Sequence, residues 1–276
     1  MGATPVLISI VLTLQASSDL VLPAAAGQAN YAALLARIRE KGTAAAESLE
    51  DSKGPKPITC SNLLGISRGR DFLYLGADQQ VAFRFTGLTQ AASTALVDSL
   101  LEHPPVTWPL ANQLLQVAAV TCDPNKHSWA GRTTYEELAA EPLRQLSHVG
   151  RQVTLEFASP TAFKSRDQTV PFPLPGLVFG NLAERWNRFS LISLSPEIRR
   201  YSEELIAISH YKLECRSINP SNASLRIGSV GKATYQTLTG DRYWMGVMQT
   251  LASFAFYAGV GVQTTAGMGQ VRRIGT

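Results

Sequence analysis

Apolar and polar positions follow a regular series along the first half of the chain. Runs that are apolar or alternate with polar residues are typical of strands, and apolar residues three and four apart are typical of helices. The strands expected here are 6–14, 58–66, 81–88 and 114–121. Helices are expected over 30–49, where Gly42 is a candidate interruption, and over 93–101. The order is β-α-β-β-α-β.

The second half repeats this order. After a connecting helix over 133–146, the expected strands are 153–158, ended by Ser159-Pro160, then 208–216, 224–234 and 270–274, with helices over 177–189 and 241–257. The split β-α-β pattern predicts a ferredoxin-like fold. We therefore expect an α+β protein of two tandem ferredoxin-like, RRM-like domains, residues 1–146 and 147–276.

Composition narrows the class of protein. The 276 residues are 45% hydrophobic and only 17% charged, which excludes disorder for most of the chain. Three widely separated cysteines, an odd number, argue against a disulfide framework and a thiolate zinc site. The run Val6–Leu14 lacks the basic residues that precede a signal peptide core, and no apolar stretch reaches the roughly 18 residues of a membrane span. We expect a cytoplasmic protein.

Charge divides unevenly between the halves. Residues 1–150 hold 11 Lys and Arg against 13 Asp and Glu, whereas residues 151–276 hold 14 against 8. A nucleic acid draws much of its affinity for a protein from neutralised phosphates. The basic excess of the second half predicts an anionic partner there, although a simply soluble basic surface explains the same count.

A glycine-rich segment near the C-terminus, GVGVQTTAGMG, is the most distinctive motif. Its glycines are Gly259, Gly261, Gly267 and Gly269, and Thr264, Thr265, Arg272 and Arg273 accompany them. Glycine permits positive φ and close backbone approach, so main-chain amides here could meet phosphate oxygens, with hydroxyl donors and positive charge beside them. Dinucleotide and P-loop spacings do not fit the sequence. A tight turn without a ligand is the alternative.

The segment 254–273, FAFYAGVGVQTTAGMGQVRR, resembles the C-terminal signature of the CRISPR repeat-cleaving endoribonucleases of the RAMP superfamily. The resemblance extends to FASPTAFKSR at 157–166 and PFPLPGLVFGNLAERWN at 171–187. In the first half it rests only on 27–37 and on KPITCSNL at 56–63. It implies two ferredoxin-like domains.

The resemblance also implies an activity. Such a protein binds the stem-loop of a CRISPR repeat transcript, cuts it once and retains the guide RNA for an effector complex with other subunits and target DNA. The reaction needs no metal or cofactor, because a 2′-hydroxyl attacks the adjacent phosphate and side chains move the protons. The four histidines are scattered, without metal-ligand spacing.

The sequence departs from this family at the catalytic position. Members commonly carry a histidine just after the first helix, where this chain has Glu50, and no histidine precedes His103. The catalytic candidates are Tyr31, Glu50, Lys53 and Lys56: Tyr31 to orient or protonate, either lysine to stabilise the phosphorane, and Glu50 as base. His127 or His148 are alternatives.

Basic residues of the second half are the candidates for RNA contact, since A-form duplex is recognised through backbone and shape. They are Lys164, Arg166, Arg185, Arg188, Arg199 and Arg200, besides the glycine-rich segment. Two other functions stay open: a catalytically inactive subunit that caps the guide's 3′ stem-loop, and a different RAMP subunit that packs along guide RNA.

Overall fold

A computed structural model describes residues 7–42, 46–47, 49, 54–64, 72–144, 150–218 and 226–275. The chain forms two compact units. Unit 1 comprises the residues up to Thr133 together with Thr265–Gly267 from the C-terminal region. Unit 2 runs from Thr134 and includes the remaining C-terminal residues, Met268–Thr276 among them. Glu50, Lys53 and His148 lie outside the described residues.

Unit 1 is built on an antiparallel sheet of the ferredoxin-like type. Its strands lie in the order β3-β5-β1-β7-β6, and β8 pairs with the start of β1. The strands are β1 (Leu7–Gln15), β3 (Ile58–Cys60), β5 (Gln80–Gly87), β6 (Thr107–Leu110), β7 (Gln113–Thr121) and β8 (Gly131–Thr133). A separate two-stranded sheet pairs β2 (Leu20–Pro23) with β4 (Phe72–Leu75).

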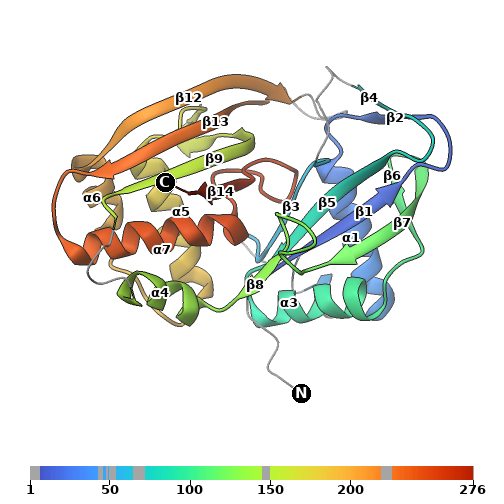
Figure 1. Ribbon diagram of the computed structural model, residues 1–276, viewed down its shortest axis with the longest axis horizontal. Coiled ribbons are helices and arrows are strands. Elements are labelled where there is room, and N and C mark those ends of the chain that lie inside the picture. Colours follow the sequence, from blue (N-terminus) through green and yellow to red (C-terminus); the bar gives the residue numbers. More distant parts are fainter. Residues whose placement is uncertain are drawn as a thin grey trace. The chain divides into compact units, whose positions relative to one another are not determined.

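Helices cover one face of the unit 1 sheet (Figure 1). They are α1 (Gly27–Lys41) and α3 (Gln90–Leu96), which continues into a π-helical turn, η1 (Val97–Glu102). Leu34 and Ile38 of α1 join Phe83 and Phe85 of β5 in one buried cluster. Thr89 caps α3 by accepting a hydrogen bond from the Ala92 amide. Alternation along β5 thus places its aromatic side chains against the helices.

Unit 2 repeats the arrangement with the strand order β12-β13-β9-β14. Its strands are β9 (Gln152–Thr161), β12 (Ile206–Ile218), β13 (Arg226–Thr237) and β14 (Val271–Ile274), and β10 (Phe163–Ser165) and β11 (Gln168–Val170) form a small hairpin. The helices are α4 (Tyr135–Arg144), α5 (Pro175–Phe189), α6 (Ile198–Leu205) and α7 (Arg242–Ala258). Trp186 of α5 meets Phe254 of α7 edge to face in the buried core. In Figure 1, α7 lies along the sheet that contains β9 and β14.

These orders confirm the prediction of two ferredoxin-like domains, because β1-α1-β3-β5-α3-β7 and β9-α5-β12-β13-α7-β14 share one topology. Details differ. The helix expected over 30–49 ends at Lys41, before Gly42. Strand β9 continues through Ser159-Pro160, where we expected it to stop. The chain divides at Thr133 and not at 146, because α4 packs on α7 of unit 2.

No helix in the described part of the chain combines the length and the apolar character that a membrane crossing requires.

Candidate nucleic-acid interface

The glycine-rich segment connects α7 to β14. Its four predicted glycines, Gly259, Gly261, Gly267 and Gly269, all have positive φ, between 63° and 90°. Gln263 shares the left-handed conformation, with φ of 57°. A side chain at Gly261 would overlap the Ala162 carbonyl oxygen, and one at Gly269 would overlap the Val260 carbonyl oxygen. Glycine is therefore required here for both conformation and close backbone packing.

Most amides of the segment are already bonded within the protein. Val260 and Val262 donate to the carbonyls of Gly269 and Ala162 at 2.9 Å each. The Gly261 amide donates to Asn181 Oδ1 at 2.8 Å, and the Gly269 amide to the Pro160 carbonyl at 3.1 Å. The predicted row of phosphate-binding amides is therefore wrong for the base of the segment, where strand β9 and helix α5 use them.

Arg185 supports the same segment from α5. Its side chain is 5% exposed, and Nη1 and Nη2 donate to the carbonyls of Ala258 and Gly261 at 3.0 Å each. Burial lowers the pKa of Arg185 to about 10, partly offset by the charge of Glu184. Ala258 ends α7, so the guanidinium satisfies a carbonyl that the helix leaves unpaired. The direct RNA contact predicted for Arg185 does not fit this burial.

The tip of the segment differs from its base. Among the residues that the structure describes, none accepts a hydrogen bond from the four consecutive amides of 263–266. Thr265 is half-buried, whereas Thr264 is 4% exposed, so its hydroxyl is not the surface donor that the sequence suggested. Free amides in a tight turn suit anions such as phosphate. The part of the segment fit for a ligand is thus the tip alone.

The residues after the tip are held within unit 1. The Gly267 amide donates to the Cys60 carbonyl at 3.1 Å, and the Gly267 carbonyl accepts a hydrogen bond from Asn62 Nδ2 at 3.3 Å. Asn62 Oδ1 in turn accepts from the Gly27 amide, the first of α1, at 2.7 Å. Asn62 is 5% exposed, and from its position just after β3 it bonds both the start of α1 and Gly267, the residue that follows the tip.

Of the four catalytic candidates, the structure describes two. Tyr31 lies one turn after Gly27 on α1 and is half-buried, and Lys56 lies just before β3, also half-buried. Both residues take part in at least one further interaction within the protein. His127 accepts a hydrogen bond from the Trp129 amide through Nδ1 at 3.1 Å. Tyr31 and Gly267 both belong to unit 1: Tyr31 lies on α1, and Gly267 packs against the first residue of that helix.

The predicted RNA-contacting cations occupy two kinds of position. Lys164 and Arg166 lie exposed on the β10–β11 hairpin, and Arg188 lies exposed on α5, as do Arg199 and Arg200 on α6. Arg272 is instead paired with Glu156 across β14 and β9 at 2.6 Å, and Arg273 lies 3.8 Å from Glu141. The β10–β11 hairpin and helices α5 and α6 thus carry exposed cations, whereas Arg272 and Arg273 pair with acidic side chains of the protein.

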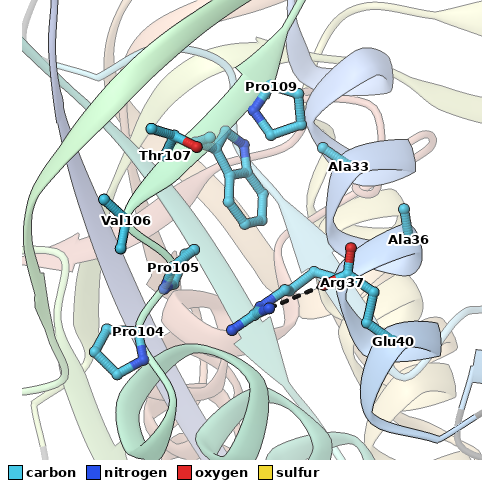
Figure 2. A pocket seen from close by; sticks show the side chains of 10 residues that line it. Ala33, Ala36, Arg37, Glu40, Pro104, Pro105, Val106, Thr107 and Pro109 are labelled. Carbon is cyan, nitrogen blue, oxygen red and sulfur yellow. Dashed lines mark hydrogen bonds and ion pairs between the residues drawn. The ribbon is translucent and has the colours of Figure 1, made fainter.

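A cavity of about 430 Å³ lies beside α1 in unit 1. Figure 2 shows Arg37 of α1 reaching toward Pro104 and Pro105, with Glu40 in ion-pair contact at 2.9 Å. Arg37 also donates to the carbonyls of Ser99 and His103. None of the residues predicted to act on RNA lines the cavity. The Arg37 guanidinium in it already bonds Glu40, Ser99 and His103.

Asp98, Glu102 and His103 form a partly exposed group whose ligand atoms lie close enough together to hold a metal ion. Histidine spacing alone does not reveal this group, because two of its three members are carboxylates. Exposed acidic residues cluster often on protein surfaces, and His103 pairs with Asp98 at 3.1 Å.

Two supporting residues were missed from sequence. Asn181 and Asn62 each bond a main-chain group of the glycine-rich segment from 80 and 205 residues away. Their only sequence signal is that each falls inside a stretch that carries the family resemblance, at 171–187 and 56–63.

Comparisons with known proteins agree with that resemblance. Residues 155–271 match the family model of the CRISPR-associated endoribonuclease Cas6. A relative of that name from Streptococcus thermophilus is 27% identical over 166 residues, 58% of this chain and 67% of that protein. Another from Mycobacterium tuberculosis is 26% identical over 151 residues, 52% of this chain and 47% of that protein, so the match spans about half of its length.

Solved structures extend the likeness over the whole fold. A Cas6 product complex is 24% identical with a TM-score of 0.78, covering 98% of this chain and 100% of that one. A Cas6 substrate mimic complex is 25% identical with a TM-score of 0.70, covering 98% and 99%. Thermus thermophilus Cas6 is 22% identical with a TM-score of 0.74, covering 99% and 100%. These matches support the resemblance to the CRISPR repeat-cleaving endoribonucleases of the RAMP superfamily: residues 155–271 match the Cas6 family model, and the two ferredoxin-like units have the fold of solved Cas6 structures.

Proposed function

We propose that this protein is an endoribonuclease that binds the stem-loop of a CRISPR repeat and cuts the precursor transcript into guide RNA. The observation that carries the proposal is the tip of the glycine-rich segment: none of the described residues accepts a hydrogen bond from the amides of 263–266, whereas the flanking amides of Val262 and Gly267 are bonded to Ala162 and Cys60. Phosphodiester oxygens are the ligands that such amides suit. Relatives named as CRISPR-associated endoribonucleases support the assignment.

The reaction we propose is an attack by the 2′-hydroxyl on the adjacent phosphate. It breaks the bond to the 5′-oxygen and leaves a 2′,3′-cyclic phosphate and a 5′-hydroxyl. One group must take the 2′ proton, another must protonate the leaving oxygen, and a cation or donor must stabilise the phosphorane. We assign orientation or protonation to Tyr31, phosphorane stabilisation to Lys56 or Lys53, and the base to Glu50.

Contact with the RNA stem is proposed for Lys164, Arg166 and Arg188, which are exposed. We further propose that the product remains bound as part of an effector complex with other subunits and target DNA. The cation count of the second half supports a polyanionic partner.

A second candidate function is an inactive cap on the guide's 3′ stem-loop. The observation that favours it is Glu50, which stands where this family commonly has a catalytic histidine, and the first histidine in the chain is His103.

Incubation of the purified protein with repeat RNA in EDTA separates the two. An endoribonuclease of this mechanism yields one cut with a cyclic phosphate end, and a 2′-deoxy substitution at the cut site abolishes cleavage but preserves binding. Binding without any cut supports the cap. Cleavage that persists on the deoxy substrate, or that requires a divalent metal, contradicts the mechanism.

A further inference from the structure

The first turn of α1 is in close contact with Ala266, the last residue of the tip, and with Gly267, which follows it. A Cβ atom at Gly27 would lie 2.6 Å from the carbonyl carbon and oxygen of Ala266 and from the Gly267 amide nitrogen. Real Cβ atoms do not approach backbone so closely, so only glycine allows this contact. The backbone of Ala266 and Gly267 thus rests directly on the start of the helix.

Asn62 stabilises this contact between α1 and Gly267 through two hydrogen bonds. Helix α1 begins without a side-chain cap, because its N-cap residue is Ala26. Asn62 Oδ1 takes that role from another element by accepting from the Gly27 amide, while its Nδ2 donates to the Gly267 carbonyl. Each half of one amide group therefore holds a different partner, and the side chain is buried. A fixed rotamer and two bonds give a defined distance between α1 and Gly267.

We propose that Gly27 and Asn62 are positioning residues for RNA binding: they hold Ala266, the last residue of the tip, and Gly267 against the first turn of α1, a contact that we call the seat. This inference rests on the proposed function. Amides bind phosphate well only when they are held in place beforehand, since ordering a loose turn on binding costs affinity. The same contact fixes the Ala266 backbone relative to Tyr31, one helical turn further along α1, so it also positions RNA for cleavage.

The test uses two variants that disturb the seat in different ways. Gly27→Ala adds a methyl group that Ala266 and Gly267 must move away from, although alanine is the better helix former. Asn62→Asp keeps the acceptor for Gly27, with a charge that a helix N-terminus favours, but loses the donor to Gly267. The matched control is Gly42→Ala at the other end of the same helix, where a Cβ atom meets nothing within 4 Å.

We expect all three variants to keep the thermal midpoint of the wild type within a few degrees. Gly27→Ala and Asn62→Asp should both bind repeat RNA at least about tenfold more weakly than Gly42→Ala. A factor of this size corresponds to the loss of one charge-assisted hydrogen bond to a phosphate. The salt dependence of Gly27→Ala should keep its slope, because no cation is removed. Single-turnover cleavage at saturating RNA should also be slower, which a purely stabilising role would not produce.

Amide hydrogen exchange in the absence of RNA gives an independent measurement. The Gly267 amide should exchange faster in both seat variants than in Gly42→Ala. Wild-type affinity with unchanged exchange in Gly27→Ala and Asn62→Asp would overturn the inference. If Gly27→Ala does not fold, Asn62→Asp decides alone, measured also at high salt, where wild-type affinity would refute the seat. If even the wild type binds no repeat RNA, the proposed function fails, and this inference with it.

Discussion

Replacement of Arg185 by methionine tests how the base of the glycine-rich segment is held. The substitution removes two charged hydrogen bonds, to the carbonyls of Ala258 and Gly261. Such bonds contribute roughly 1.5–3 kcal/mol each, so their loss costs roughly 3–6 kcal/mol. The substitution also removes a buried charge whose Nε has no partner.

The second effect offsets much of the first. Burial lowers the pKa of Arg185 from its ordinary value to about 10, which corresponds to roughly 3 kcal/mol of unfavourable burial at neutral pH. The free energy of unfolding should therefore fall by only about 0–3 kcal/mol in Arg185→Met. Arg185→Lys should be the less stable of the two, because it keeps a buried charge and one ammonium cannot reach both carbonyls.

Urea unfolding at pH 7 measures both variants, with Arg188→Met on the exposed face of α5 as control. The control should stay within about 0.5 kcal/mol of the wild type. A loss above about 5 kcal/mol in Arg185→Met would mean that the buried charge carries no penalty. A lysine variant more stable than the methionine variant would equally refute the reasoning.

Three further predictions follow from exposure and burial. Lys164→Ala should weaken RNA binding and make its log–log salt dependence shallower by roughly 0.7 to 0.9, the range from single-stranded to duplex contacts, because the side chain is exposed on a hairpin proposed to contact phosphates. In the native protein, Cys215 should react with a thiol reagent, whereas Cys60 should stay protected until the protein unfolds, because it is buried and burial raises its pKa. The free energy of unfolding should decline as pH rises above about 9. Burial raises the pKa of Cys60 and of two phenols, Tyr135 and Tyr235, in the folded protein. At alkaline pH these groups therefore lose their protons more easily in the unfolded chain, which stabilises the unfolded state.

Each of these has a matched comparison. Lys126→Ala, an exposed lysine of unit 1, should leave the salt slope unchanged, and an equal change in both lysine variants would remove Lys164 from the interface. Modification of Cys60 at the rate of Cys215 would contradict its burial. Alkaline loss should reach about 1.4 kcal/mol per pH unit for each group, opposed only near pH 10 and above by Arg185, whose lowered pKa acts in the opposite sense. A flat unfolding midpoint between pH 8 and 10 is inconsistent with that account.

The main elements could be predicted from sequence because their apolar faces are periodic. Strand β5 alternates so regularly that its aromatic residues could only face the helices. Short strands such as β2 and β8, of four and three residues, hold too few positions for any period. The sequence does not predict that β9 continues through Pro160, because proline normally marks the end of a strand.

The candidate site was predictable only in part. The glycine positions could be found because their conformation requires that residue type. Arginine is normally exposed, so nothing in the sequence distinguishes the buried Arg185 from the exposed Arg188. The partners of the segment are also distant in sequence, and Asn62 lies 205 residues before Gly267. These distant partners determine which amides of the segment are hydrogen-bonded. The glycine motif alone therefore could not predict which amides are available to a ligand.

The assignment of Thr265–Gly267 to unit 1 has a consequence for biosynthesis. A nascent chain that has emerged only as far as Thr133 lacks the residue that bonds the Cys60 carbonyl and the Asn62 amide group. Domains generally fold as they leave the ribosome, from the N-terminus onward. The unit that is translated first therefore cannot be completed until Thr265–Gly267 have been synthesised, after most of unit 2.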